Sequence, residues 1–276
     1  MIDLLNYLEQ LPNIKKIGIL TNGTLIKQNI EFLKRLTKLH YVQVSLEGRR
    51  EINDVIRGNG AFDNIIESTR VLVDSGIPTR WMVTLHKKNV KEVPFIIDLA
   101  LENNIDTLTF ERLIPMGSGE SLSSYVLSPE ELKKTFMYIV KRSDEEYSKG
   151  SPLRILKLRT LWVLIDPKRA EKGSITPIEK EVGASCSIGM DSLCILPDAT
   201  VLPCRRLPIP IGNLKEDRIF KIWYTSKLLW ELRDKSNLKG KCKNCEYVAR
   251  CSGCRATAYA VTGDYLAEDP QCWKTA

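Results

Sequence analysis

Residues 1–185 of this 276-residue chain contain no cysteine, and the whole chain has only two histidines, His40 and His86. No apolar run approaches the ~18 residues that a bilayer-spanning helix needs, so we expect no membrane helix. The first ten residues carry two acidic and no basic side chains, which argues against a secretory signal peptide. Without an export signal, the expected compartment is the reducing cytoplasm, where disulfides rarely persist.

No segment carries a strong excess of one charge. Residues 186–276 hold 14 Lys and Arg against 10 Asp and Glu, and residues 1–185 hold 27 against 24. We therefore expect no nucleic-acid-binding surface, despite the net charge of +7. The hydrophobic content of 43% and the length fit one large or two modest globular domains.

Residues 1–150 alternate between expected strands and helices. Short apolar runs predict strands, and the segments between them repeat apolar residues at helical spacing. The expected strands are Ile17–Thr21, Tyr41–Leu46, Pro78–Leu85 and Thr107–Arg112, and the expected helices are Asn29–Leu36, Ala61–Ser75, Val93–Asn103 and 129–147. Because each helix must return the chain to the same edge, the strands should be parallel. The expected fold class is α/β, as a partial (βα) barrel or an open parallel sheet.

Polar residues follow the expected strands, at the edge where such sheets bind ligands. They include Asn22, Ser45, Glu47, Asn89 and the pair Glu111-Arg112. The alternative interpretation is that these are ordinary loop residues. Farther along, Ser128 and Glu131 are spaced as a capping box at the start of the last of these helices.

Residues 151–185 form a less regular bridge between two expected domains. Its first part, LRILKLRTLWVLI, fits a strand or a helix, and its second part is polar with Pro167, Gly173 and Pro177. We therefore expect domains at 1–150 and 186–276, joined by this bridge.

All eight cysteines lie in the second domain. Two CxxC pairs, Cys242/Cys245 and Cys251/Cys254, stand close together, with Cys186, Cys194 and Cys204 before them and Cys272 after them. A [4Fe–4S] cluster takes four cysteine thiolates, so eight cysteines are enough for two clusters. The excess of four positive charges in 186–276 would balance two such clusters, each of charge about −2 with its thiolates.

Zinc is the main alternative to iron–sulfur clusters. A zinc ribbon usually separates its two CxxC pairs by ~15–20 residues, whereas only five residues separate Cys245 from Cys251. Both histidines lie outside the cysteine-rich segment. The spacing therefore favours iron–sulfur clusters over zinc, and the expected compartment argues against disulfides.

The segment CKNCEYVARCSGCRATAYAVTGDYLAEDPQC resembles the SPASM extension of radical S-adenosylmethionine (SAM) enzymes, and TNGTLI, VSLEG, IRGNGAF and TLHKKN resemble the later part of their barrel. The resemblance implies a partial radical SAM barrel followed by a small, irregular, cysteine-rich SPASM domain. It is similar to the subgroup that contains radical haem synthases and the mycofactocin maturase. Arg205 follows the third cysteine, where sulfatase-maturating relatives have an aspartate, which argues against that activity.

The resemblance also implies site residues. By resemblance, one auxiliary [4Fe–4S] cluster is held by Cys186, Cys194, Cys204 and Cys254, and a second by Cys242, Cys245, Cys251 and Cys272. Two residues separate Cys251 from Cys254, where many relatives have three. In the barrel part, Asn22, Ser45 and Arg57 are candidates for contact with SAM. Arg57 would pair with the carboxylate of SAM. The alternative interpretations are that Asn22 only forms a turn, that Ser45 only caps a loop and that Arg57 only makes a surface ion pair.

The sequence departs from the family in one respect. The CxxxCxxC motif that holds the SAM-cleaving cluster, and the GGE motif after it, are absent. We expect the chain to be a fragment or a mis-started reading frame, or less readily a degenerate protein, and expect the upstream DNA to encode both motifs. SAM and a third [4Fe–4S] cluster would then belong only to a full-length parent.

By resemblance, the parent is an oxidoreductase whose 5′-deoxyadenosyl radical abstracts hydrogen from a tetrapyrrole or a ribosomal peptide. Its expected electron donor is a ferredoxin or flavodoxin. The alternative is a non-catalytic iron–sulfur or zinc module that recognises a partner. Neither the substrate nor the oligomeric state is indicated by the residues.

Overall fold

The computed structural model describes residues 1–158, 160–165, 182–183 and 186–274. The chain divides into two compact units. The first comprises Met1–Arg112 and Tyr138–Leu156, and the second comprises Leu113–Met137 and Lys157–Ala276. The predicted divisions at 150 and 185 stay predictions, and most of the second half of the predicted bridge, 166–181, lies outside the described residues.

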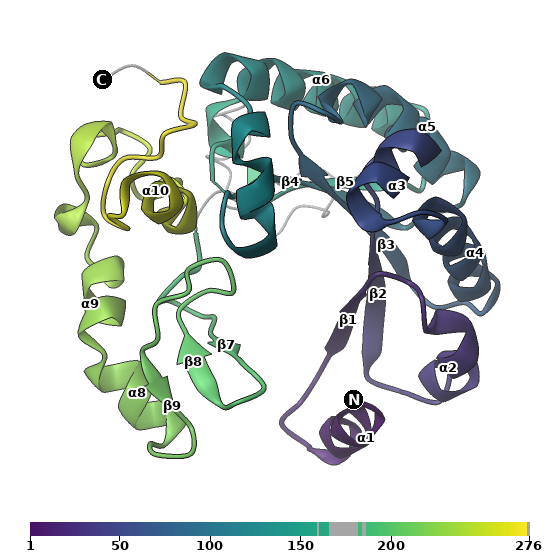
Figure 1. Cartoon of the computed structure of the whole chain (residues 1–276), viewed down its shortest axis with the longest axis horizontal. Helices are drawn as coiled ribbons and strands as arrows, with labels where there is room; N and C mark the ends of the chain where they lie inside the picture. The colour runs from purple at the N-terminus through teal and green to yellow at the C-terminus, as the bar shows by residue number, and fades with distance from the viewer. Residues whose placement is uncertain (159, 166–181, 184–185, 275–276) are drawn as a thin grey trace. The chain divides into compact units, whose positions relative to one another are not determined.

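The first unit is built on a parallel sheet, with its strands in chain order (Figure 1). The strands are β1 (Ile17–Thr21), β2 (Leu39–Ser45), β3 (Thr79–Leu85), β4 (Thr107–Arg112) and the beginning of β5 (Arg154–Leu158). The predicted bounds of β1 and β4 are confirmed, and the part of the bridge that fitted a strand or a helix begins as a strand. The predicted α/β class with parallel strands is therefore confirmed.

Helices α2, α3, α4 and α5 lie on one side of this sheet (Figure 1). The helices of the first unit and its boundary are α1 (Ile2–Gln10), α2 (Ile26–Leu33), α3 (Arg50–Arg57), α4 (Ala61–Asp74), α5 (Val93–Glu102) and α6 (Pro129–Ser148). The prediction missed α1 and α3 and placed α2 three residues late. The capping box is confirmed, because Ser128 N donates to Glu131 Oε2 over 2.8 Å and Glu131 N donates to Ser128 Oγ over 3.2 Å.

The core of the first unit lies between the sheet and its helices. Along β3, buried residues alternate with half-buried ones, so Trp81, Val83 and Leu85 share the buried face. Trp81 Nε1 donates to Thr69 Oγ1 of α4 over 2.9 Å, which satisfies the only polar atom of this side chain. This packing fixes the strand ends, where β2 and β3 deliver the polar residues of the candidate site.

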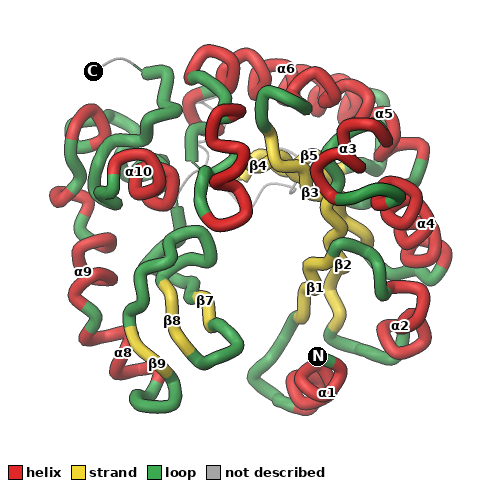
Figure 2. The backbone as a smooth tube through the Cα atoms, viewed as in Figure 1, coloured by secondary structure: helices red, strands yellow, loops and turns green. Residues whose placement is uncertain are grey.

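The second unit is less regular, and most of its length from β7 onwards is loop and short helix (Figure 2). A three-stranded antiparallel sheet has the order β7–β8–β9, and β6 pairs with the end of β5. The elements are β6 (Val182–Gly183), β7 (Cys194–Ile195), β8 (Thr200–Leu202), β9 (Gly212–Asn213), α8 (Ile219–Thr225), α9 (Lys227–Arg233) and α10 (Arg255–Thr262), with 3₁₀ turns at Gly117–Tyr125, Trp162–Leu164, Lys235–Asn237 and Gly240–Cys242.

Two small apolar clusters hold this unit together. Phe136 stacks on Trp162 with ring centroids 3.6 Å apart. Elsewhere Ile188, Leu207 and Leu232 are buried with Ala256 of α10. Cores of this size bury little apolar surface, so bound groups can contribute strongly to the stability of such a unit. None of the helices in the described ranges is long and apolar enough to span a membrane.

Candidate iron–sulfur centre

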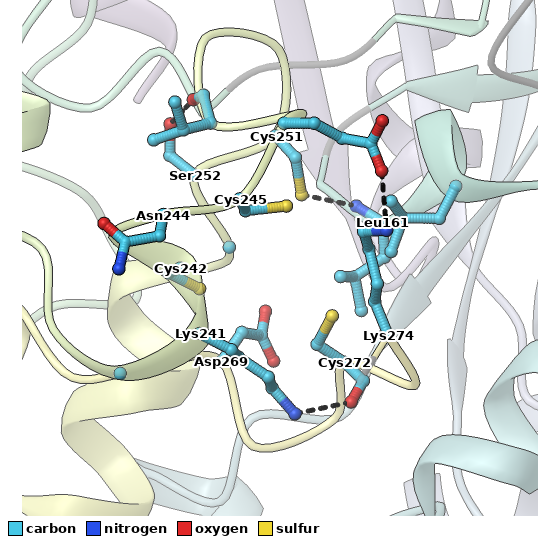
Figure 3. Close-up of a pocket in the computed structure, with 15 residues that line it drawn as sticks. Leu161, Lys241, Cys242, Asn244, Cys245, Cys251, Ser252, Asp269, Cys272 and Lys274 are labelled. Atoms are coloured by element: carbon cyan, nitrogen blue, oxygen red, sulfur yellow. Dashed lines mark hydrogen bonds and ion pairs between the residues drawn. The ribbon is translucent and has the colours of Figure 1, made fainter. Parts of the chain in front are cut away.

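Four cysteines surround one pocket in the second unit. Cys242, Cys245, Cys251 and Cys272 line a cavity of about 530 Å³. Their sulfur atoms lie around the same space in Figure 3, although Cys272 is 21 residues beyond Cys251 in the chain. These are the four residues assigned by resemblance to the second auxiliary cluster.

A left-handed turn separates the two cysteines of the second CxxC pair. Ser252 and Gly253 between them both have positive φ, +58° and +63°. The turn lets Cys251 line the pocket while Cys254 packs against the apolar cluster around Ile188. The two cysteines of this CxxC pair, Cys251 and Cys254, therefore face different parts of the second unit.

Burial controls the protonation of the pocket thiols. It raises the pKa of Cys251 to about 11, although the Leu161 amide donates to Cys251 Sγ over 3.4 Å. Burial also raises the pKa of Cys272. Without a cation, both groups are therefore thiols at neutral pH. Metal ions that bind thiolates would displace these protons.

The other four cysteines also lie near one another. Burial raises the pKa of Cys186 to about 11, and the neighbouring Cys254 and Cys204 raise it further. Burial and the neighbouring Cys204 likewise raise the pKa of Cys194. Cys194 belongs to β7. Cys204 follows β8 and pairs through its backbone with Leu207 in an isolated antiparallel β-bridge. These are the four residues assigned by resemblance to the first auxiliary cluster.

The donor set fits iron–sulfur clusters. A tetrahedral zinc ion with Zn–S distances of about 2.3 Å would draw four sulfur atoms together and leave no cavity between them. The pocket that Cys242, Cys245, Cys251 and Cys272 line together with eleven other residues instead has a volume of about 530 Å³. This volume favours a group larger than a single zinc ion.

The three candidate SAM contacts lie at the carboxyl ends of β1 and β2 or close to them in sequence. Asn22 directly follows β1, and Ser45 ends the neighbouring strand β2. Asn22 Oδ1 accepts hydrogen bonds from the amide and hydroxyl of Thr24, at 3.2 and 2.9 Å. Ser45 is half-buried. Their contact with SAM stays a prediction.

Arg57, the third candidate, ends α3 and pairs with a buried carboxylate. Its Nη2 donates to Glu47 Oε1 over 2.5 Å, and Glu47 is 4% exposed. Burial raises the pKa of Glu47, and the Arg57 charge opposes that rise. The predicted alternative for Arg57, an ion pair, does form, but its partner is buried and does not lie at the surface.

Two residues of the segment after β3 complete this buried group. Asn89 Nδ2 donates to Glu47 Oε2 over 3.3 Å and to Thr84 O over 2.9 Å. His86 Nε2 lies 3.9 Å from Glu47 Oε2 and has no hydrogen-bond partner among the described residues. Burial, with the nearby Lys88 charge, lowers the pKa of His86 to about 4, so the ring is neutral at pH 7.

Several residues of both sites were not among the predicted site residues. Glu47 and Asn89 were noted only as polar residues near strand ends, and nothing in their sequence context revealed that they would meet. Asp269 and Arg255 adjoin the cysteine pocket, where Asp269 Oδ2 accepts a hydrogen bond from Cys254 N over 2.7 Å. The one available signal for Arg255 was its position directly after Cys254.

Parallel strands followed by a unit with two groups of four cysteines define an iron–sulfur protein of the α/β class. Two family models match the chain: the radical SAM superfamily over residues 1–100, and the SPASM iron–sulfur cluster-binding domain over residues 186–246. Two relatives from Methanosarcina barkeri are similar over nearly the whole chain. An AdoMet-dependent heme synthase is 31% identical over 265 residues, covering 93% of this chain and 74% of the relative. An Fe-coproporphyrin III synthase is 30% identical over 274 residues, covering 93% and 68%. The chain therefore belongs to the radical SAM family with a SPASM domain, as predicted.

Solved structures show the same fold. Streptococcus suis SuiB bound to S-adenosylmethionine matches with a TM-score of 0.74 at 18% identity, over 99% of this chain. The match covers 63% of SuiB, so the chain spans less than two thirds of that protein. The structure titled anSMEcpe with bound AdoMet matches with a TM-score of 0.67 at 19% identity. The predicted partial barrel of the radical SAM type is confirmed by these folds.

Proposed function

We propose that this chain is the later barrel and auxiliary-cluster portion of a radical SAM oxidoreductase, with two [4Fe–4S] clusters in its second unit. The observation that carries the proposal is the pocket lined by Cys242, Cys245, Cys251 and Cys272. The second group, Cys186, Cys194, Cys204 and Cys254, is proposed to hold the other cluster. When bound, such clusters supply one-electron transfer, and SAM supplies the radical that abstracts hydrogen.

The chain's own residues hold and shield these groups. The eight cysteine sulfurs would bind iron as thiolates, with their protons released to solvent, and the buried surroundings of Cys251 would limit the access of water to its sulfur. In the first unit, Arg57 presents a cation to the SAM carboxylate, while Glu47 fixes its guanidinium. Ser45 and Asn22 contribute hydrogen bonds to the polar part of the same ligand. These contacts are proposals drawn from the family resemblance and the strand-end positions.

The proposed substrate is an iron tetrapyrrole. Relatives at 31% and 30% identity are named as a heme synthase and an Fe-coproporphyrin III synthase. The SuiB structure titled as bound to its precursor peptide SuiA shares the fold at 18% identity, which supports no choice of substrate. A ribosomal peptide is therefore the second candidate. We also propose a ferredoxin or flavodoxin as electron donor and the reducing cytoplasm as location, where free thiols persist.

The cluster assignment is tested by removing one cysteine group at a time. After anaerobic reconstitution, Cys186→Ser/Cys204→Ser and Cys242→Ser/Cys272→Ser should each keep about four of about eight iron atoms. Cys186→Ser/Cys242→Ser, which removes one cysteine from each group, should lose both clusters. If the two paired variants instead lose all iron, the proposed division into two independent groups is wrong.

The substrate is tested by titrating the reconstituted chain with iron coproporphyrin. A saturable shift of the porphyrin absorbance band supports a tetrapyrrole. No shift at any porphyrin concentration, with intact clusters, argues for the peptide instead. Serum albumin at equal concentration controls for nonspecific uptake of porphyrin.

A further inference from the structure

A buried arginine touches one sulfur of the cysteine pocket. Arg255 begins α10, directly after Cys254, and is only 2% exposed. Its Nη2 lies 3.9 Å from Cys242 Sγ, within the range of a hydrogen bond to sulfur. Arg255 directly follows Cys254, a ligand of one proposed cluster, and contacts Cys242, a ligand of the other.

Two backbone carbonyls hold the guanidinium in this position. Arg255 Nη1 donates to Ala267 O over 2.7 Å and to Tyr265 O over 3.1 Å. Gly253 leaves the space that the group needs, because a Cβ there would lie 2.6 Å from Arg255 Nη2. The local backbone is therefore shaped around the guanidinium.

No carboxylate within the described ranges lies at ion-pair distance from Arg255, and its buried Nε has no hydrogen-bond partner. Carbonyl dipoles reduce the cost of burying a cation but do not neutralise it, and an uncompensated buried charge is costly. The Lys239 hydrogen bond and, to a smaller extent, the Arg255 charge lower the pKa of Asp264, and a group of negative charge in the pocket would add to this partial balance of Arg255.

A buried carboxylate, Asp269, also lines the pocket. Its two oxygens accept hydrogen bonds from the amides of Cys254, over 2.7 Å, and Gln271, over 3.0 Å. Its charge opposes that of Arg255 at the same pocket. Of these two side chains, Arg255 is the one that donates a hydrogen bond to a cysteine sulfur among the described residues.

The other cysteine group has weaker positive neighbours. Arg205 follows Cys204 and is exposed, and Lys235, which acts on Cys186, is half-exposed. Solvent screens both charges more than it screens a cation that is 2% exposed. The two proposed clusters therefore lie in different electrostatic surroundings.

We propose that Arg255 is the positioning residue that raises the reduction potential of the cluster held by Cys242, Cys245, Cys251 and Cys272 above that of the other cluster. The inference rests on the proposed function. One electron passes from a one-electron reductant to the cluster, whose charge with its four thiolates changes from about −2 to about −3, and no proton is required. A buried cation beside a ligand sulfur stabilises the more negative state.

The test is a redox titration of the reconstituted 276-residue chain, followed by electron paramagnetic resonance. Wild type should show two one-electron steps, and Arg255→Gln should lower the potential of the higher step only. The expected loss is at least tenfold in the equilibrium constant for reduction, which is about 59 mV for one electron. Arg255→Lys, which keeps the charge but loses the planar fork, should show a smaller shift. The exposed control Lys227→Gln should shift neither step.

Iron and sulfide content separates the possible failures. Wild type without clusters would overturn the proposed function and this inference with it. Full clusters with an unchanged potential in Arg255→Gln would overturn this inference alone. If clusters are lost in Arg255→Gln but kept in Arg255→Lys, the potential of Arg255→Lys decides: a lowered higher step would support the inference, and an unchanged one would overturn it. Loss in both variants would overturn it and leave Arg255 a packing role.

Discussion

Arg57 donates a 2.5 Å hydrogen bond to the carboxylate of Glu47, a side chain that is only 4% exposed. The same carboxylate accepts a hydrogen bond from Asn89, which follows the next strand of the sheet. Glu47 therefore ties α3 to the ends of β2 and β3. This arrangement fixes the guanidinium that we propose for the SAM carboxylate, and it has measurable consequences for stability.

Removing the Glu47 carboxylate should destabilise the first unit strongly. Glu47→Ala leaves the Arg57 charge and the Asn89 amide without their buried partner, at a cost of about 3–5 kcal/mol in the free energy of unfolding. Urea unfolding of purified variants measures this loss. The matched control is Glu31→Ala, whose partner Lys34 is also a cation but whose side chain is 77% exposed, with an expected change within about 0.5 kcal/mol. Equal effects of the two substitutions would contradict the buried pair.

His86 should make the protein less stable in mild acid. Its pKa is about 4 in the folded protein and about 6.5 when unfolded, so between these values only the unfolded chain binds the proton. The stability from this group is complete above about pH 6.5 and decreases as the pH falls towards 4. Wild type should therefore lose up to about 2 kcal/mol more than His86→Gln between pH 7 and pH 5.

Urea unfolding at the two pH values, with and without the His86 substitution, provides the comparison. Glu47 and Lys88 face or adjoin this ring, and both remain in the variant, so their own titration largely cancels. Parallel losses of stability in the two proteins would show that His86 does not carry the effect.

Gly253 should be needed for the cluster pocket. In Gly253→Ala, the new Cβ would lie 2.6 Å from Arg255 Nη2 and 2.7 Å from Asp269 Cβ, and the residue would also keep φ near +63°. We expect this variant to hold about half the iron of wild type, because only one pocket is distorted. Gly263→Ala is the matched control, since φ there is +74° but nothing lies within 4 Å. Full iron content in Gly253→Ala would be incompatible with the crowding described.

The 276-residue chain should not cleave SAM, because its first cysteine is Cys186 and it contains no CxxxCxxC motif. With dithionite and SAM, the reconstituted chain should form no 5′-deoxyadenosine above a control without protein. Chromatography of the quenched mixture measures the product. Turnover by this chain would mean that one of the two cysteine groups performs the cleavage.

Much of the fold was predictable from the sequence, because its strands are short apolar runs followed by turns. The bounds of β1 and β4 were predicted as observed, and the Ser128–Glu131 capping box forms. Helix α3 was missed although Ile52, Val55 and Ile56 recur at helical spacing, because the segment is only eight residues long and lies close to the longer helix α4. Helix α1 was missed because Leu5 is its one buried residue.

The candidate sites were predictable only in part. The family resemblance supplied the two groups of cysteines, and the structure brings each group together. Spacing alone does not give this division, because Cys251 and Cys254 are neighbours that face different places. The buried groups around Glu47 and Arg255 depend on tertiary contacts between residues far apart in sequence, such as Glu47 with Asn89, and no local pattern encodes them.

The metal content of the chain purified and reconstituted under argon tests the central claim most directly. The account predicts a brown protein with about eight iron and eight sulfide per chain, from two clusters of four. A colourless protein that holds zinc at the same cysteines and negligible iron would contradict it.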